Sequence, residues 1–273
     1  MTEGPRRFFF VHVMKTGGTT LALHMARQFE PAELYPNESL DRRHASDVGS
    51  YMSIDDLLGV SPERKLAIRA YTGHFPFMVR DELGIDLETF TLLRDPIERS
   101  ISSLKHFKRL YERYRALSLD EIYEDAFVFR HFVHNHQTKV FAVTAADRPR
   151  AIASALTQEQ LHAYLASDSS TPDPGEGGAP DTISIDDARL GLAKRRLAEI
   201  DVIGTSEQFA EFVEELRRRY GWWPSGLTAD ARANVSEEPW AAGSALRARI
   251  ADDNRFDLEL YDYGRRLIAE RKS

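Results

Sequence analysis

The sequence predicts an α/β fold in which helices cover both faces of a largely parallel sheet. Runs rich in β-branched, aromatic or aliphatic residues occur at 8–13, 89–93 and 200–204, and a segment with helical periodicity follows each run. Strands that alternate with helices form parallel sheets, because each connection has to cross back over the sheet. The 273 residues, 42% of them hydrophobic, suffice for one large core, so we expect a single domain over residues 1–273.

The first unit passes from the strand at 8–13 through the hexapeptide KTGGTT at 15–20. Apolar residues then recur at helical spacing at Leu21, Ala22, Met25 and Phe29. The pattern predicts a strand, a tight turn and a helix.

The second unit begins with the apolar strand at 89–93 and continues into a helix that we expect to reach residue 116. Its start carries three signals: Asp95 as the N-cap, Pro96 at the first helical position, and Glu98 as the third residue of a capping box. Local signals therefore predict where this helix begins.

The third unit is the strand at 200–204 and a helix over 209–220 that ends at Gly221. Further helices are predicted at 120–143, at 151–166, and at 246–268 with an irregularity near Asn254.

Residues 167–187 differ in composition from the rest of the chain. They are rich in proline and glycine, and they hold six acidic residues but no lysine or arginine. We predict a flexible acidic loop inside the domain, because the strand pattern resumes after it. Two interpretations stay open for this loop: a solvated excursion, or a lid over a substrate.

Composition and charge exclude several classes of protein. The net charge of −7 argues against a nucleic-acid partner. Without cysteine, disulfides, thiolate nucleophiles and cysteine-based zinc sites are excluded. The apolar run at 8–13 is too short for a signal peptide, and no stretch approaches the roughly 18 uncharged apolar residues of a transmembrane helix. We therefore expect a cytoplasmic protein with no transmembrane segment.

The hexapeptide at 15–20 has the composition of an anion-binding turn. A glycine pair between a strand and a helix lets backbone N–H groups converge on an anion at the positive end of the helix dipole. The side chains that add donors are Lys15, Thr16, Thr19 and Thr20. In the nucleotide-triphosphate P-loop the lysine follows the glycines, whereas here it precedes them. The alternative interpretation is a plain turn.

A second set of phosphate donors follows the strand at 89–93. Arg94 closes that strand, and Ser102 lies two turns into the next helix. Both can bind one phosphate, the guanidinium through two parallel hydrogen bonds. The alternative is a core helix with an ordinary polar face.

Together the two segments resemble sulfotransferases that use 3′-phosphoadenosine 5′-phosphosulfate (PAPS). Residues 10–20 (FVHVMKTGGTT) resemble the 5′-phosphosulfate loop of that family, and residues 93–102 (LRDPIERSIS) resemble its 3′-phosphate motif. The likeness is to the carbohydrate type, which includes the heparan sulfate 2-O-sulfotransferases and bacterial relatives, and it extends over about residues 8–267. It implies a P-loop-NTPase-like sheet with helical insertions, PAPS as the sulfuryl donor, the bisphosphate PAP as a product, and no metal. Met14, where the family usually has proline, is a departure that removes no donor.

The resemblance also implies roles for individual residues. Lys15 contacts the sulfate-bearing 5′-phosphate and stabilises charge on the leaving oxygen. The other implied nucleotide contacts are Thr16, Gly17, Gly18, Thr19 and Thr20 at the 5′-phosphate, Arg94 and Ser102 at the 3′-phosphate, and Asn234 and Ser236 beside the nucleotide.

Transfer of a sulfuryl group to a hydroxyl needs a group that takes the proton. The resemblance implies His74, because the 2-O-sulfotransferase pattern has a Gly-His at a similar distance ahead of its Arg-Asp-Pro. A histidine suits this role because most of it is neutral at cellular pH. The alternatives are a structural histidine packed beside Phe75 and Phe77, and His106 as a reserve base. We expect His12 to be structural.

The segment at 130–139 (RHFVHNHQTK) holds three histidines. Their spacing suits no single helix face and no carboxylate accompanies them, so a metal site is the weaker interpretation. Asn135, Gln137 and Lys139 resemble a segment near the active site of bacterial relatives. We expect them to contact substrate or cofactor, with a role in fixing a helix end as the alternative.

The expected function is PAPS-dependent O-sulfation of a small molecule or glycan, either a carbohydrate or another polar acceptor. One rival is an ATP-dependent P-loop phosphotransferase, which predicts magnesium dependence and a carboxylate that holds the metal. The other rival is a non-catalytic protein that binds the nucleotide bisphosphate.

Overall fold

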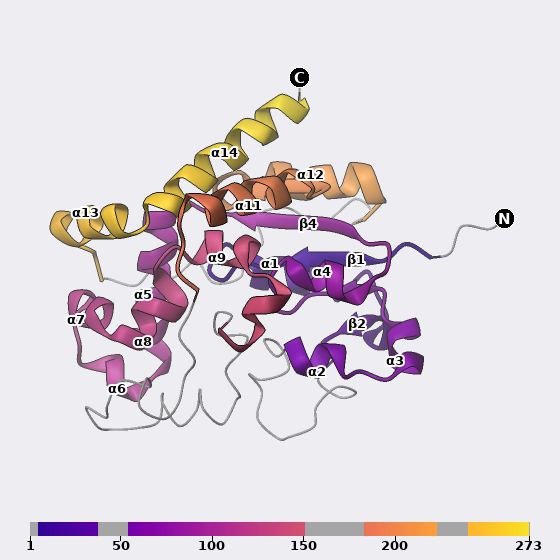
Figure 1. The fold of residues 1–273 in the computed structure, drawn as a ribbon, viewed down its shortest axis with the longest axis horizontal. Helices are drawn as coiled ribbons and strands as arrows, with labels where there is room; N and C mark the ends of the chain where they lie inside the picture. Colours follow the sequence, from indigo (N-terminus) through magenta and orange to yellow (C-terminus); the bar gives the residue numbers. More distant parts are fainter. Residues whose placement is uncertain (1–4, 38–53, 151–182, 223–239, 273) are drawn as a thin grey trace.

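The computed structural model describes residues 5–37, 54–150, 183–222 and 240–272. In this part of the chain five parallel strands form one sheet in the order β2-β3-β1-β4-β5 (Figure 1). The strands are β1 (Phe8–Val11), β2 (Leu34–Tyr35), β3 (Ala70–Tyr71), β4 (Glu88–Leu93) and β5 (Val202–Thr205). β1 lies at the centre of the sheet and pairs with both β3 and β4. The predicted α/β class and the predicted parallel sheet are confirmed.

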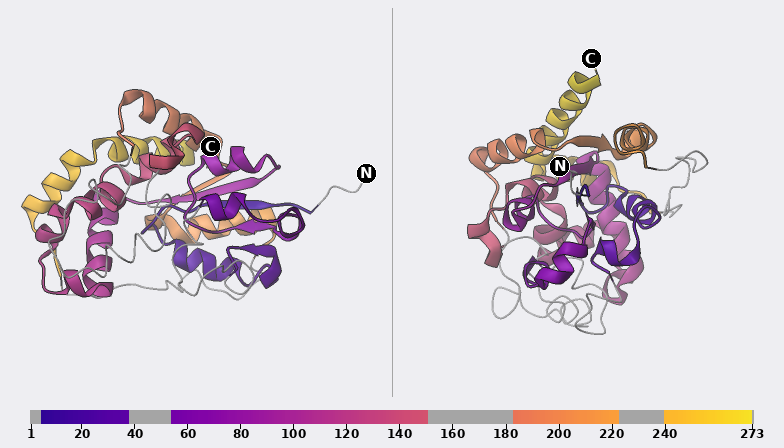
Figure 2. Two further views of the ribbon diagram at one scale, coloured as in Figure 1. Left: turned by 60° about the horizontal axis from the view of Figure 1, so that its bottom comes forward. Right: turned by 90° about the vertical axis from the view of Figure 1, so that its right-hand side faces the viewer.

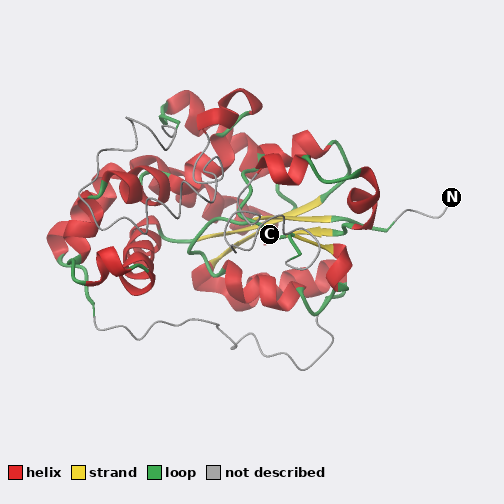
Figure 3. Ribbon diagram, turned by 90° about the horizontal axis from the view of Figure 1, so that it is seen from below, coloured by secondary structure: helices red, strands yellow, loops and turns green. Residues whose placement is uncertain are grey.

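Alternate residues of β1 enter two separate cores, as the two-residue period of a strand requires. Phe8 and Phe10 pack with α1 (Gly18–Met25) and α12 (Phe209–Tyr220). Phe9 and Val11 face the opposite core. The helices of that second face are α4 (Met78–Leu83), α9 (His136–Ala142), α11 (Asp187–Ala198) and α14 (Arg255–Lys272). Figure 3 shows the strands between the two helical layers.

A third core lies beyond the carboxyl ends of the strands. It is formed by α5 (Pro96–Leu110), α7 (Leu119–Glu124), α8 (Ala126–Val128) and α13 (Ser244–Asp253). Together with α6 (Glu112–Arg115), these helices gather at the end of the molecule toward which the strands point (Figures 1 and 2). Two short α-helices, α2 (Ile54–Leu58) and α3 (Pro62–Ala67), lie near β2 (Figure 1), and the 3-10 turn η1 (Pro31–Glu33) leads directly into β2.

Several predicted boundaries are confirmed. Asp95 caps α5, because its Oδ1 accepts hydrogen bonds of 3.0 Å from the N–H groups of Ile97 and Glu98. Gly221 ends α12 in the left-handed conformation. Asn254 separates α13 from α14 at the predicted irregularity.

Other predicted elements are wrong in extent. The helix after Asp95 stops at Leu110, and Tyr111 separates it from α6. The predicted helix at 120–143 is divided into α7, α8, the π-helical turn η2 (Phe129–Val133) and α9. Asp125 causes one break because its carboxylate caps α8, and Asn135 causes another because its φ is 47°.

The capping box predicted at Glu98 is also wrong. The Glu98 carboxylate turns instead to Arg247 of α13, and the N–H of Asp95 donates to Glu207 at 3.2 Å. The acidic loop was predicted to end at residue 187, but α11 begins there, with Asp186 as its N-cap. The predicted helix at 151–166 and the loop up to residue 182 lie outside the described residues.

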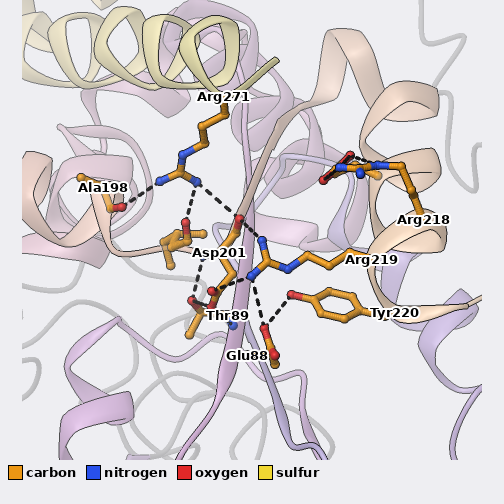
Figure 4. A network of polar contacts seen from close by, with 10 residues as sticks. Glu88, Thr89, Ala198, Asp201, Arg218, Arg219, Tyr220 and Arg271 are labelled. Carbon is orange, nitrogen blue, oxygen red and sulfur yellow. Dashed lines mark hydrogen bonds and ion pairs between the residues drawn. The ribbon is translucent and has the colours of Figure 1, made fainter. Parts of the chain in front are cut away.

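A polar network at the amino ends of β4 and β5 fixes the last helix to the sheet (Figure 4). The Asp201 carboxylate accepts from the N–H and the hydroxyl of Thr89, both at 2.8 Å, and from Arg219 at 3.1 Å. Arg271 of α14 donates to the carbonyl oxygens of Ala198 and Ile200. This network lies at the opposite end of the strands from the sequence motifs.

Among the helices that the structure describes, none is long and apolar enough to cross a membrane.

Candidate active site

The predicted motifs meet at the carboxyl ends of three neighbouring strands. Because β3, β1 and β4 are adjacent in the sheet, the residues that follow them lie side by side. His74 follows β3, the loop with Lys15 follows β1, and Arg94 follows β4. Residues about 80 positions apart in sequence are thus placed around one point.

Two glycines shape the loop after β1 for different reasons. Gly17 has a φ of 99°, a left-handed conformation that favours glycine. At Gly18 a Cβ atom would lie 1.8 Å from the His12 ring, so only glycine allows this close approach. The Thr16 hydroxyl donates to the carbonyl of Val13 at 2.9 Å and closes the turn.

Helix α1 begins at the end of this loop with an open first turn. Its N-cap is Gly17, which has no side chain that could accept from the first-turn N–H groups. Thr19 is exposed at this end, whereas Thr20 is buried. The N-terminus of α1 therefore has no side-chain cap at Gly17, and anion binding there stays a prediction.

Arg94 is held at the edge of this loop. Its Nη1 donates to the carbonyl of Lys15 at 3.1 Å. The main chain of Arg94 is clamped by Gln137, whose Nε2 donates to the Arg94 carbonyl at 2.8 Å and whose Oε1 accepts from the Arg94 N–H at 3.1 Å. Ser102 lies two turns along α5 and is partly exposed. The backbone from which the Arg94 side chain extends is therefore held in place by Gln137.

The hydrogen bond of His74 defines its tautomer. Its Nδ1 lies 3.2 Å from the carbonyl oxygen of His12, and a carbonyl only accepts, so Nδ1 carries the hydrogen. The Nε2 atom therefore keeps a lone pair. Burial lowers the pKa of His74 to about 4, and the nearby charge of Lys15 lowers it further, against the opposing effect of the His12 carbonyl. This imidazole is neutral at cellular pH and has an open acceptor atom, as a general base needs.

His106 has the opposite tautomer. Its Nδ1 lies 3.5 Å from a guanidinium nitrogen of Arg109, which only donates, so the hydrogen of the neutral ring is on Nε2. Burial lowers the pKa of His106 to about 3, with further lowering by the charges of Lys15 and Arg109. Of the two candidate bases, His74 has the tautomer that exposes Nε2 as an acceptor.

The His12 ring packs against the His74 ring. Its ring centroid lies 3.9 Å from that of His74, and its Nδ1 lies 3.2 Å from the carbonyl oxygen of Thr72. Burial holds the pKa of His12 well below its usual value. The position agrees with the structural role expected for this residue.

The three residues expected to contact substrate or cofactor are all buried. Asn135, Gln137 and Lys139 are each 1% exposed. Asn135 donates its N–H to the Asn254 side chain at 2.7 Å, and Lys139 donates to the carbonyl of Arg130 at 2.7 Å. Burial also lowers the pKa of Lys139 to about 7. Direct contact with a ligand stays a prediction, whereas the link from Gln137 to Arg94 is an observed contact.

Asp257 connects this segment to α14 and was not assigned a role from the sequence. Its carboxylate accepts from the N–H of Gln137 at 3.0 Å and from both donors of Thr138 at 2.7 Å. Burial raises the pKa of Asp257. The signal available in the sequence is an acidic residue in the first turn after the predicted irregularity near Asn254.

Ser206 and Glu207 were also missed. They follow β5 and contact both motifs, Ser206 through the carbonyl of Thr16 and Glu207 through the N–H of Asp95. Their signal was their position, since they are among the first residues after a predicted strand of a parallel sheet.

Two predicted site residues, Asn234 and Ser236, lie outside the described residues. In the part that is described, no three His, Cys, Asp or Glu side chains gather as a metal ion would need. A cavity of about 400 Å³ lies along β5 between α12 and α14, with Phe212 and Ile268 in its wall. None of the motif residues lines it, so it is separate from the candidate active site.

No protein-family model matches this sequence, and no curated protein matches it either. The functional proposal therefore rests on the motifs and on their geometry.

Buried histidines predict that acid destabilises the fold. The histidines whose pKa burial lowers are His12, His24, His74, His106, His131, His134 and His136. Below about pH 6.5 the histidines of the unfolded chain bind protons, whereas those of the folded chain stay neutral. The free energy of unfolding is therefore highest above that pH and declines as the pH falls. We expect the Tm to drop by at least about 5 °C between pH 7 and pH 5 in thermal unfolding. A Tm that stays constant over this range would contradict the burial of these rings.

Proposed function

We propose that this protein is a sulfotransferase that transfers the sulfuryl group of PAPS to a hydroxyl of a carbohydrate or another polar acceptor. The observation that carries the proposal is the convergence of Lys15, His74 and Arg94 at three adjacent strand ends. Each brings a different capability: a cation beside an anion-binding turn, a neutral base and a bidentate donor. In-line transfer from a nucleotide with two phosphate sites needs this combination.

The donor set of the site fits PAPS. The open first turn of α1 and the Lys15 ammonium suit the 5′-phosphate, and Arg94 with Ser102 suits the 3′-phosphate. When bound, PAPS supplies the sulfuryl group and leaves as PAP. A loop after the central strand β1 also supports a P-loop-like classification of the sheet.

In this proposal His74 accepts a proton from the acceptor, and Lys15 stabilises negative charge on the leaving group. His74 takes the proton of the acceptor hydroxyl at Nε2 while its Nδ1–H stays on the His12 carbonyl. Lys15 offsets the negative charge that develops on the leaving phosphate oxygen.

Labelled PAPS and a panel of hydroxyl acceptors test the proposal directly. We expect transfer of label to at least one saccharide or polar alcohol, and tight binding of PAP in calorimetry without magnesium. Tight PAP binding with no transfer to any acceptor would favour the non-catalytic nucleotide binder. Binding of ATP with magnesium in preference to PAP would overturn the proposal in favour of a phosphotransferase.

Arg94→Ala is expected to weaken PAP binding by about 10- to 100-fold, because a partly buried arginine and its charge-assisted contact to the 3′-phosphate are lost. The turnover number should change much less, since that phosphate does not react. Calorimetry with PAP and initial rates at saturating PAPS measure the two effects. Arg115→Ala is the matched control, because Arg115 is an exposed arginine that pairs with Glu112. Equal PAP affinity in both variants would remove Arg94 from the 3′-phosphate site.

A further inference from the structure

The turn after β5 touches both phosphate-binding motifs, although β5 pairs only with β4. This turn is η6 (Ser206–Gln208), and it leads into α12. The Thr205 hydroxyl caps it by accepting from the N–H of Gln208 at 3.3 Å. The η6 turn is therefore held in place at the carboxyl end of β5.

Ser206 reaches across β4 to the loop after β1. Its Oγ donates to the carbonyl of Thr16 at 2.5 Å and also lies 3.4 Å from the carbonyl of Leu93. Phe209, at the start of α12, packs on the same loop, within 3.8 Å of the point where a Gly17 side chain would begin. The backbone of the 5′-phosphate loop is thus held by β5 and α12 as well as by its own turn.

Glu207 holds the second motif. Its Oε1 accepts from the N–H of Asp95 at 3.2 Å, next to Arg94. Its Oε2 accepts from the Tyr261 hydroxyl of α14 at 3.0 Å. Burial, with the Glu207 carboxylate beside it, raises the pKa of Tyr261, so the hydroxyl remains a donor. The Glu98 carboxylate pairs with Arg247 and does not accept from the N–H of Asp95. Glu207, on another element, is the acceptor for that N–H instead.

We propose that Ser206 and Glu207 are positioning residues that hold the 5′-phosphate loop and the 3′-phosphate motif at a fixed separation. The inference rests on the proposed function, because it assigns the two motifs to the two phosphates of one nucleotide. Adjacent residues of one turn bind one motif each, so the two sites move as a unit. A ligand with both phosphates then gains binding free energy at the second site, because no entropy is lost in ordering that site.

The test compares two nucleotides in calorimetry: PAP, which has both phosphates, and AMP, which has only the 5′-phosphate. In the wild type we expect PAP to bind at least about 100-fold more tightly than AMP. Ser206→Ala and Glu207→Ala should each lower this preference about tenfold, while the affinity for AMP changes by less than about threefold. Tyr261→Phe removes only the hydroxyl that orients Glu207 and keeps the packed ring, so it should lower the preference to a smaller extent.

Glu211→Gln is the matched control. Glu211 lies four residues after Glu207, in the first turn of α12, where its carboxylate pairs with Lys272. We expect this variant to keep the wild-type preference. If Glu207→Ala does not fold, Ser206→Ala and Tyr261→Phe carry the test.

The outcomes separate the two levels of the proposal. A wild-type protein without preference for PAP over AMP would overturn the proposed function, and the inference with it. A strong wild-type preference that Ser206→Ala, Glu207→Ala and Tyr261→Phe all retain would overturn the positioning role alone. Equal losses for PAP and AMP would also overturn it, because they would show general loosening of the fold.

Discussion

Lys15→Ala is expected to lower kcat by roughly 100- to 1,000-fold, because the cation that offsets charge on the leaving oxygen is lost. The loop should keep its shape. Lys15 already has a φ of 68°, and alanine faces the same backbone strain as lysine at that angle. Rates with saturating PAPS, and circular dichroism of both proteins, measure the effect and the fold.

Lys194→Ala is the matched control for Lys15. The Lys194 ammonium pairs with Glu259 at 2.6 Å on the helices of the second face, away from the motifs. Its turnover should equal that of the wild type. A Lys15→Ala enzyme with near-normal kcat would show that another group stabilises the leaving phosphate.

His74→Asn is expected to lower kcat by about 100- to 10,000-fold while PAP affinity stays within about threefold. Asparagine can still donate to the His12 carbonyl, as Nδ1 of His74 does, so the substitution removes the base and keeps the local contact. His106→Asn is the comparison variant. If His106 were the base, the large loss would appear in that variant instead.

The pH profile gives an independent test of His74. Because its pKa is lowered to about 4, the imidazole stays neutral well below pH 6.5. The wild-type kcat/KM should therefore show no decline centred near pH 6.5, and acid inhibition should appear only toward pH 4 to 5. Rates taken within seconds of a pH jump separate this effect from the slower loss of the fold. A decline centred on pH 6.5 would show that the base is an ordinary exposed imidazole.

Local chemistry made much of the fold predictable from the sequence. The three strands at 8–13, 89–93 and 200–204 are predictable because each segment is rich in β-branched, aromatic or aliphatic residues, and each lies in the parallel sheet. The N-cap at Asp95 and the helix stop at Gly221 were found because they depend on neighbours within four residues.

The missed elements are those that distant contacts stabilise. β2 and β3 have two residues each, which is too short for any periodic pattern. They exist because β3 pairs with β1, and β2 pairs with β3. Asp125 and Asn135 divide a segment with continuous helical periodicity, because their contacts to the helices around them outweigh its propensity.

For the candidate site, the sequence by itself determined which residue types were available: a glycine-paired turn with a lysine, an arginine at a strand end, and a histidine after a glycine. Only the tertiary structure decided how they are held. It supplied Glu207, 112 residues away, as the acceptor for the N–H of Asp95. It also brought the Gln137 side chain into hydrogen-bonding contact with the main chain of Arg94. It also fixed the hydrogen of His74 through the carbonyl of His12. The physical reason is that a hydrogen-bond partner across the sheet is chosen by the path of the whole chain, whereas a turn or a cap is chosen by a few neighbouring residues.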